Sequence, residues 1–144
     1  MTQEDKELLI KDLCARLPYG VKMTHIADNE HCPKTLIGIV KDMITLEGIG
    51  GYECVDIEDY KPYFFPLSSM TEEQKQEFIS VAGYERREED CGRHTETYYY
   101  DMVGHEHNFY PNIDAIDWLN KNKFDYRGLI PKGLANDATG KNIY

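Results

Sequence analysis

The sequence lacks any long hydrophobic run, and it lacks the usual start of a secreted protein. No segment approaches the ~18 consecutive apolar residues that identify a membrane-spanning helix. The first residues, Met-Thr-Gln-Glu-Asp-Lys, are polar and acidic, whereas a signal peptide has a basic end followed by an apolar stretch. We therefore expect a soluble, cytoplasmic protein that makes no contact with a membrane.

Cysteine and positive charge are both scarce. The four cysteines, at positions 14, 32, 54 and 91, are widely spaced and form no Cys-x-x-Cys pair, which favours reduced thiols over disulfides. The 26 acidic residues exceed the 16 basic ones, and the net charge of −10 argues against direct binding to nucleic acid. Residues 111–144 are the exception, because their net charge is slightly positive, so an acidic partner could approach them most easily.

Common catalytic motifs are also absent. There is no Gly-x-Ser-x-Gly elbow, and Gly48-Ile-Gly-Gly51 lacks the Lys-Ser/Thr that completes a phosphate-binding loop. Ser68 and Ser69 precede a predicted helix, where serine is typical of a cap. The sequence thus predicts no catalytic residue and no cofactor, and it favours a protein that is not an enzyme.

The chain is long enough to form one domain with its own core. It has 144 residues, of which 41% are hydrophobic, so it needs no metal or disulfide for stability. Helical periodicity and capping residues predict helices over residues 2–17, 72–82 and 112–122. Alternating and β-branched residues predict strands over 21–26, 35–46, 52–57 and 96–103.

The segment from Lys61 to Lys75 is the most specified part of the sequence. Pro62 and Pro66 flank aromatic residues and are expected to prevent strand pairing, so the segment is predicted to be a joint. Thr71 and Gln74 then have the spacing of a capping box that begins a helix. Together these elements predict an α+β fold: a single domain over residues 1–144, with a small antiparallel sheet and about three helices. Residues 84–110 are predicted to be a mobile or inserted segment, and residues 136–144 a loose C-terminus.

One cluster has metal-ligating chemistry. A thiolate and three imidazoles could complete a tetrahedral zinc site, and the cluster consists of Cys91, His94, His105 and His107. The spacing does not match a diagnostic zinc motif, and the simpler interpretation is a polar surface loop that contains histidines by chance. Zinc binding is therefore an alternative hypothesis.

Several segments resemble a known group of proteins. They include Lys11-Asp-Leu-Cys-Ala-Arg-Leu-Pro-Tyr-Gly-Val21 and Phe124-Asp-Tyr-Arg-Gly-Leu-Ile130, together with residues 56–63, 68–73, 118–120 and 132–135. In these segments the chain resembles a family of small uncharacterised proteins encoded by gut bacteria and by their phages or mobile elements. The resemblance implies no activity, no cofactor and no catalytic residue.

These segments are rich in residue types that anchor interfaces. We expect a partner-binding surface built from residues 121–132 and 62–66, whose candidate residues are Tyr60, Tyr63, Trp118, Tyr126, Arg127 and Lys132. The simpler alternative is that these aromatic residues pack the core. The sequence therefore favours an accessory protein that acts through protein–protein contact. The alternatives are the zinc-binding protein and an acidic mimic of DNA that occupies a DNA-binding protein.

Overall fold

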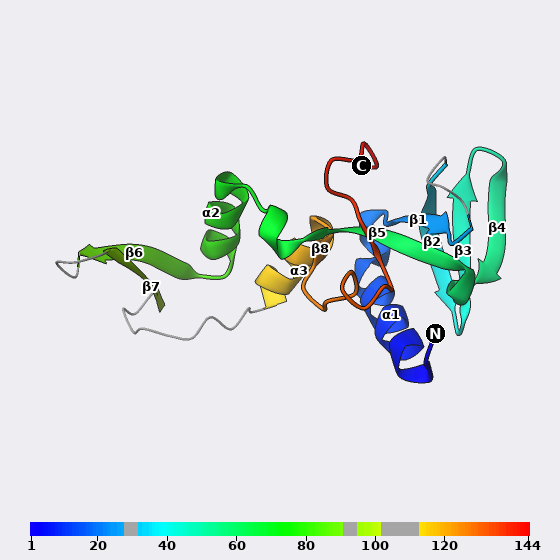
Figure 1. The fold of residues 1–144 in the computed structure, drawn as a ribbon, viewed down its shortest axis with the longest axis horizontal. Coiled ribbons are helices and arrows are strands. Elements are labelled where there is room, and N and C mark those ends of the chain that lie inside the picture. The colour runs from blue at the N-terminus through cyan, green and yellow to red at the C-terminus, as the bar shows by residue number, and fades with distance from the viewer. Residues whose placement is uncertain (28–31, 91–94, 102–112) are drawn as a thin grey trace. The chain divides into compact units, whose positions relative to one another are not determined.

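The computed structural model describes residues 1–27, 32–90, 95–101 and 113–144. Over these residues the chain forms three α-helices, a seven-stranded and mostly antiparallel sheet and a separate two-stranded hairpin (Figure 1). The α+β prediction is confirmed. The chain forms two compact units: a larger one of residues 1–69 and 120–144, and a smaller one of residues 70–119.

The larger unit contains the seven-stranded sheet. The strand order is β4-β3-β2-β1-β5-β8, and β9 also pairs with β5. One helix, α1 (Gln3–Arg16), precedes the sheet. The strands are β1 (Lys22–His25), β2 (Lys34–Val40), β3 (Met43–Gly48), β4 (Gly51–Asp56), β5 (Tyr60–Pro66), β8 (Phe124–Asp125) and β9 (Asn136–Asp137). Single 3-10 turns follow α1, β4 and β5, namely η1 (Leu17–Tyr19), η2 (Ile57–Asp59) and η3 (Leu67–Ser69).

The helix α1 begins and packs as its sequence predicts. The hydroxyl of Thr2 accepts a hydrogen bond of 3.1 Å from the backbone N–H of Asp5, which satisfies one of the free donors at the helix N-terminus. Leu9 and Leu13, one helical turn apart, are fully buried. They belong to the same hydrophobic core as side chains of the sheet, such as Leu36, Ile44, Leu46, Ile57 and Phe64.

Residues 35–46 form two strands, so the prediction of one long strand is wrong. The chain reverses at Lys41 and Asp42, and Val40 pairs with Met43 across the turn. Lys41 has a φ of 55°, in the left-handed region that hairpin turns require. The usual Asn-Gly or Asp-Gly signal is absent here, and the β-branched residues on both sides read as one continuous strand.

The predicted joint is also wrong over residues 60–66, which form β5 in the interior of the sheet. β5 pairs antiparallel with β1 and parallel with β8 and β9. The N–H of Ile26 donates to the carbonyl of Asp59, which makes these two residues a hydrogen-bonded pair. Hydrogen-bonded and non-hydrogen-bonded pairs alternate along an antiparallel ladder. Pro62 therefore lies opposite Met23 in a non-hydrogen-bonded pair. Pairing with β9 begins only after Pro62, at Tyr63. The proline therefore interrupts neither ladder.

The C-terminal segment is held in place, which corrects the prediction of a loose terminus over residues 136–144. Asn136 and Asp137 pair with β5, and the N–H of Ala138 donates to the carbonyl of Phe64 at 2.9 Å. Upstream, the carboxylate of Asp125 accepts hydrogen bonds from the N–H groups of Leu129 (2.8 Å) and Ile130 (2.7 Å), which fixes the turn after β8.

The smaller unit contains α2 (Glu72–Val81), the hairpin β6 (Tyr84–Asp90) and β7 (Thr95–Asp101), and most of α3 (Ile113–Lys121). The predicted capping box is present: the N–H of Gln74 donates to the Thr71 hydroxyl at 3.2 Å, and the N–H of Thr71 donates to the Gln74 side chain at 3.0 Å. Gly83 follows the helix with a φ of 76°. Strand β7 matches the predicted strand over residues 96–101, and residues 102 and 103 lie outside the described part of the chain. Its partner β6 is not predicted.

The buried face of α3 includes Trp118 but not Ile113. Ile113 is 80% exposed, whereas Trp118 is only 7% exposed and its ring lies 5.4 Å from that of Phe78.

The two units differ in net charge. The smaller unit has 12 acidic and four basic residues, and the larger unit has 14 acidic and 12 basic residues. Most of the net negative charge therefore belongs to the smaller unit.

Candidate functional site

An open groove of about 360 Å³ lies in the larger unit. It is bordered by the first turns of α1, the end of β1, η2, the start of β5 and residues 132–134. Three side chains form its floor, and each is almost fully buried: Leu9 is 1% exposed, Tyr60 6% and Leu134 8%. Ile26, at the rim, is 56% exposed. The floor is therefore already buried in the core, and the apolar surface that an incoming side chain could cover belongs mainly to Ile26 and Met1, the latter 49% exposed.

The acidic residues of the groove already have partners. Lys6 Nζ lies 2.9 Å from Glu58 Oε1 and 3.1 Å from Asp42 Oδ2. Its hydrogen bonds, first to Glu58 and then to Asp42, raise the pKa of the Lys6 ammonium above its ordinary value. The Asp5 carboxylate accepts a 2.7 Å hydrogen bond from the Thr2 hydroxyl. Glu58 thus shares the single positive charge of Lys6 with Asp42, and the Asp5 carboxylate is hydrogen-bonded to the cap of α1.

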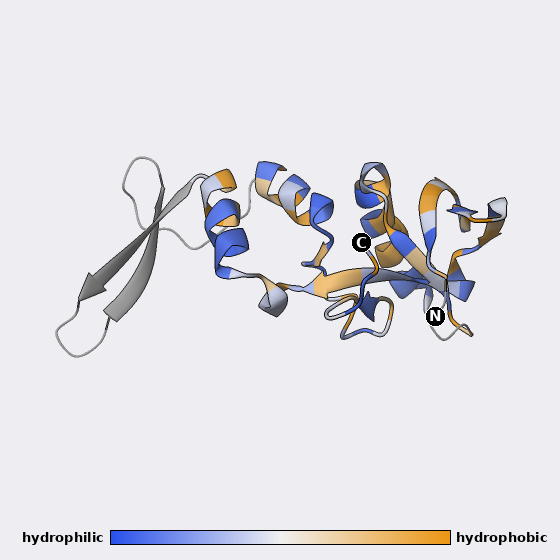
Figure 2. Cartoon of the chain, turned by 90° about the horizontal axis from the view of Figure 1, so that it is seen from above, coloured by the Kyte–Doolittle hydropathy of each residue, from blue (hydrophilic) through white to orange (hydrophobic). Residues whose placement is uncertain are grey.

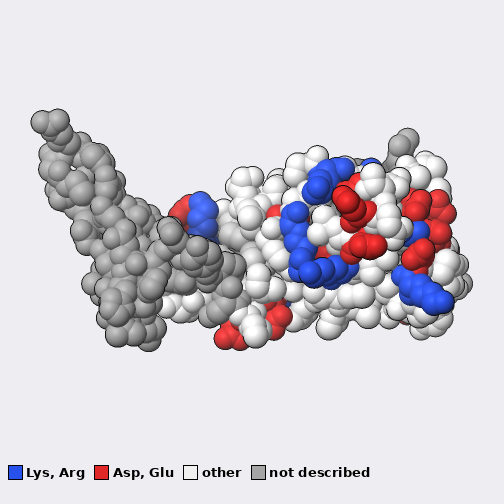
Figure 3. Space-filling model, turned by 90° about the horizontal axis from the view of Figure 1, so that it is seen from below, with Lys and Arg blue, Asp and Glu red and all other residues white. Residues whose placement is uncertain are grey.

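The basic residues of the groove differ in this respect. Lys61 comes from β5 and Lys132 from the loop before β9, and both line the groove. Neither ammonium has a hydrogen bond or an ion pair to any residue that the structure describes. The groove therefore places two uncompensated positive charges beside an apolar floor. On the face of the larger unit in Figure 3, basic and acidic side chains lie side by side, with neutral surface next to them.

Tyr60 connects this groove with a polar cluster. Its hydroxyl donates to Glu53 Oε1 at 2.8 Å and accepts from Lys34 Nζ at 3.3 Å, while Lys34 forms an ion pair with the same carboxylate. The ring of His25 meets the ring of Tyr60 edge-on, with the ring centres 5.2 Å apart. Residues from three other strands, β1, β2 and β4, thus hold the Tyr60 side chain in one orientation.

The electrostatics of this cluster favour fixed hydrogen bonds over proton transfer. The hydrogen bond to Glu53 raises the pKa of Lys34, and the hydrogen bond from Lys34 lowers the pKa of Glu53. Burial, followed by the hydrogen bond to Glu53, raises the pKa of Tyr60. All three pKa values move away from neutrality, whereas a general acid or base works best with a pKa near the ambient pH. The cluster therefore serves to hold the Tyr60 side chain in place.

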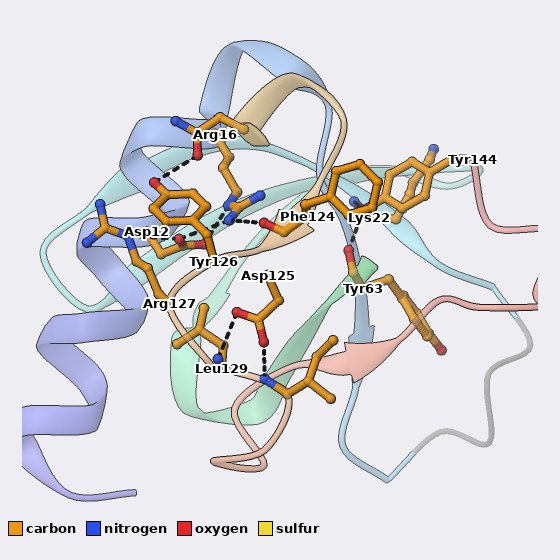
Figure 4. A network of polar contacts seen from close by, with 12 residues as sticks. Asp12, Arg16, Lys22, Tyr63, Phe124, Asp125, Tyr126, Arg127, Leu129 and Tyr144 are labelled. Carbon is orange, nitrogen blue, oxygen red and sulfur yellow. Dashed lines mark hydrogen bonds and ion pairs between the residues drawn. The ribbon is translucent and has the colours of Figure 1, made fainter. Parts of the chain in front are cut away.

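A second network, around Arg16, is buried and structural (Figure 4). Arg16 and Asp12 are both 0% exposed, and Arg16 Nε lies 2.6 Å from Asp12 Oδ2. Arg16 also donates to the carbonyl of Phe124 at 2.8 Å, and its guanidinium lies 4.2 Å from the ring centre of Phe64. Burial raises the pKa of the Asp12 carboxyl, although Arg16 acts in the opposite direction. This network ties α1 to β5 and β8.

The predicted partner-binding residues fall into three groups. Tyr60 and Lys132 both line the groove. Tyr63 and Trp118 are buried, as in the simpler alternative of core packing. Tyr126 and Arg127 belong to the network around Arg16: Arg127 Nε lies 3.1 Å from Asp12 Oδ1, and the Tyr126 hydroxyl donates to Asn120 Oδ1 at 3.1 Å.

Sequence reasoning missed most of the groove. It named neither Leu9 nor Ile26 as a site residue, and it included Lys61 only as part of the joint. Leu9 carries the signal of an ordinary core position, and nothing in the sequence shows that residues so far apart converge. The one available signal was the positive charge of the C-terminal segment, which contains Lys132.

The predicted zinc ligands Cys91, His94, His105 and His107 lie outside the residues that the structure describes. Within the described part of the chain, no three His, Cys, Asp or Glu residues are grouped so that they could hold a metal ion. Among the same residues, no helix has the length and apolar character needed to cross a membrane.

Comparisons with known proteins give no match. No protein-family model, no curated protein and no solved structure matches this chain. The resemblance to proteins of gut bacteria and phages therefore stays a prediction.

Proposed function

We propose that this protein is a non-enzymatic accessory protein that binds another protein through the groove of the larger unit. The proposed occupant is an exposed segment of the partner that carries carboxylates next to an apolar side chain. The observation that carries the proposal is the charge balance of the groove. Glu58 is paired with Lys6, whereas Lys61 and Lys132 have no partner among the described residues.

The two parts of the groove have different roles in this proposal. Contact with the exposed side chains of Met1 and Ile26 supplies apolar burial, while the buried residues of the floor fix the shape of the groove. The ammonium groups of Lys61 and Lys132 lie at the rim, where charges contribute mainly to the rate of association and to specificity. A polyanion such as DNA is a poor occupant, because the net charge of the chain is −10.

The experiment measures the binding of short fluorescent peptides by anisotropy. One peptide combines Asp and Glu with Leu and Phe, and a second replaces the acids with Asn and Gln. The test variant carries Lys61→Glu and Lys132→Glu. The matched control carries Lys11→Glu and Lys41→Glu, which change the charge equally at two exposed lysines outside the groove.

We expect the wild-type chain and the control to prefer the acidic peptide. The groove variant should bind it at least about tenfold more weakly, which corresponds to about 1.4 kcal/mol. Equal binding by the groove variant and the control, or equal binding of both peptides to the wild-type chain, would overturn the proposal. Affinity should also fall as salt rises, because the rim charges are exposed to solvent.

A second candidate function rests on the charge of the smaller unit. Its 12 acidic and four basic residues give it a strong negative charge, and Glu73 and Glu77 are exposed on α2. Such a unit could occupy a DNA-binding protein as an acidic mimic of DNA. The test is competition: salt-sensitive displacement of a DNA duplex from a basic DNA-binding domain would support mimicry, and no displacement at low salt would refute it.

A further inference from the structure

The strand β4 ends the sheet of the larger unit. Its neighbour on one side is β3, and no described residue pairs with its other side (Figure 1). We infer that this edge pairs with β4 of a second copy of the chain, so that two sheets join around a two-fold axis. This inference is independent of the proposed groove, which lies at α1, η2 and the start of β5.

The backbone of β4 presents hydrogen-bonding groups to the open side. The N–H of Ile57 donates to the carbonyl of Asp42 at 2.9 Å, which makes these two residues a hydrogen-bonded pair. Bonded and non-bonded pairs alternate in an antiparallel ladder. Val55, Glu53 and Gly51 are therefore bonded to β3. The N–H and C=O groups of Tyr52, Cys54 and Asp56 point the other way, toward the open edge.

This edge has few of the features that protect edge strands from pairing. Natural edges carry lysine or other charged side chains, proline or a bulge, or they are very short. Of these features β4 has two charged side chains, Glu53 and Asp56. The sequence of β4, Gly-Tyr-Glu-Cys-Val-Asp, has neither lysine nor proline, and its six pairs with β3 follow one unbroken register. The register shift of this sheet lies between β2 and β3 instead, at Leu36 and Gly38.

A two-fold axis at Cys54 satisfies both the hydrogen bonds and the charges. If Cys54 lies opposite Cys54 of the partner copy, Tyr52 lies opposite the second copy's Asp56, and the outward groups of all three positions bond to one another. In this register each Glu53 faces a Val55. A two-fold axis at Glu53 or at Asp56 would instead place like charges directly opposite each other, which is destabilising. The charge of Glu53 is also balanced within its own chain by Lys34.

Exposed apolar side chains gather next to this edge. Val40 is 70% exposed, Met43 39% and Tyr52 72%. Val40 pairs with Met43, and Met43 with Asp56, so these side chains form a row that leads to the edge. Figure 2 shows hydrophobic stretches in the β2–β4 region. In the proposed register the second copy's Tyr52 lies opposite Asp56, on the same face of the sheet as this row. Its ring would therefore cover part of the exposed apolar surface next to the edge.

The experiment measures the mass of the full chain by light scattering and tests the register by cross-linking. Hydrogen-bonded partners in an antiparallel pair have Cα atoms ~5.5 Å apart, which lies within the range that a disulfide or a short bismaleimide bridges. Peptide mapping identifies the linked cysteine, because Cys14 and Cys32 are also exposed. The variant Cys54→Pro removes one outward N–H and leaves the bonds to β3 intact. Cys54→Lys places two charges opposite each other, and Cys54→Ser is the matched control.

We expect a dimer whose cross-link maps to Cys54. The Cys54→Ser variant should remain dimeric without the link, while Cys54→Pro and Cys54→Lys should be monomeric, with circular dichroism showing an intact fold. If Cys54→Pro fails to fold, the Cys54→Lys variant still decides the question. A wild-type chain that is monomeric at tens of micromolar, a dimer that persists in Cys54→Lys, or links only through other cysteines would overturn the inference.

Discussion

The hydroxyl of Tyr144 donates a hydrogen bond of 2.6 Å to the carbonyl oxygen of Tyr63, which lies 81 residues earlier in the chain. The same hydroxyl accepts a hydrogen bond of 3.2 Å from the backbone N–H of Lys22 (Figure 4). One phenol thus joins the C-terminal segment to β5 and to the start of β1. Although 43% of the residue is exposed, burial raises the pKa of its hydroxyl to about 12.

Replacing Tyr144 with Phe removes both hydrogen bonds and keeps the ring. We expect the free energy of unfolding to fall by about 1 kcal/mol, the usual net contribution of a hydrogen bond. The measurement is the urea midpoint at pH 7. Tyr19→Phe is the control, because the hydroxyl of Tyr19 has no hydrogen bond to a residue that the structure describes. Equal midpoints for Tyr144→Phe and the wild-type chain would show that this bond does not hold the terminus.

The raised pKa of Tyr144 also predicts how the stability of the fold changes at alkaline pH. Its pKa rises from 10 in the unfolded chain to about 12 in the fold, so the neutral hydroxyl stabilises the fold. That stabilisation is complete below pH 10 and is lost as the pH rises toward 12. We expect the stability of the wild-type chain to fall more steeply over this window than that of Tyr144→Phe. Parallel pH profiles for the two proteins would contradict the raised pKa.

Because Asp12 and Arg16 form a buried ion pair, we expect that the effects of replacing them on the free energy of unfolding are not additive. Asp12→Ala leaves the fully buried Arg16 without its carboxylate partner and should lower the free energy of unfolding by about 3–5 kcal/mol. The double variant Asp12→Leu, Arg16→Met removes both charges and should cost much less than the sum of its single changes. A double-mutant cycle from urea unfolding measures this difference. Additive effects would mean that the two side chains act separately.

The capping box of α2 predicts a smaller effect. Thr71→Ala removes the hydroxyl that accepts from the Gln74 N–H, and we expect a loss of about 1 kcal/mol in the free energy of unfolding. Ser80→Ala is the control, because Ser80 is exposed near the end of the same helix and away from the cap. A denaturant midpoint equal to that of the control would show that Thr71 does not cap the helix.

Native mass spectrometry distinguishes the zinc hypothesis from protein binding. We expect the protein, purified without chelator, to show no added mass per chain beyond that of the polypeptide. An added mass of one zinc per chain that disappears in His105→Ala would contradict this expectation and would move Cys91, His94, His105 and His107 to the centre of the function.

The sequence predicted most helices and strands because local signals mark them. Thr2, the capping box at Thr71 and Gly83 define helix ends that need no knowledge of the rest of the fold. The failures arise where tertiary context decides. The turn at Lys41 lacks a glycine, and Pro62 fits within β5 because no ladder needs its N–H at that position. Parallel pairing of β5 with β8 and β9 joins residues more than 50 positions apart, which local patterns do not encode.

The site was less predictable than the fold. Aromatic and arginine residues are typical of interface anchors, yet aromatic residues also dominate cores, and Tyr63 and Trp118 are buried. The proposed binding role of the groove depends on which of its charged residues already have a partner, and only the folded structure shows this. Lys6 and Lys61 look alike in the sequence, but Lys6 bridges two carboxylates and Lys61 lines the groove.

The most direct measurement of the proposed function is a titration of the ¹⁵N-labelled chain with the acidic–apolar peptide, followed by NMR. We expect the backbone signals of Leu9, Ile26, Lys61, Lys132 and Leu134 to shift together with one dissociation constant, and these shifts to disappear in the Lys61→Glu, Lys132→Glu variant. Shifts confined to residues outside the groove, or unchanged spectra at millimolar peptide, would contradict binding in the groove.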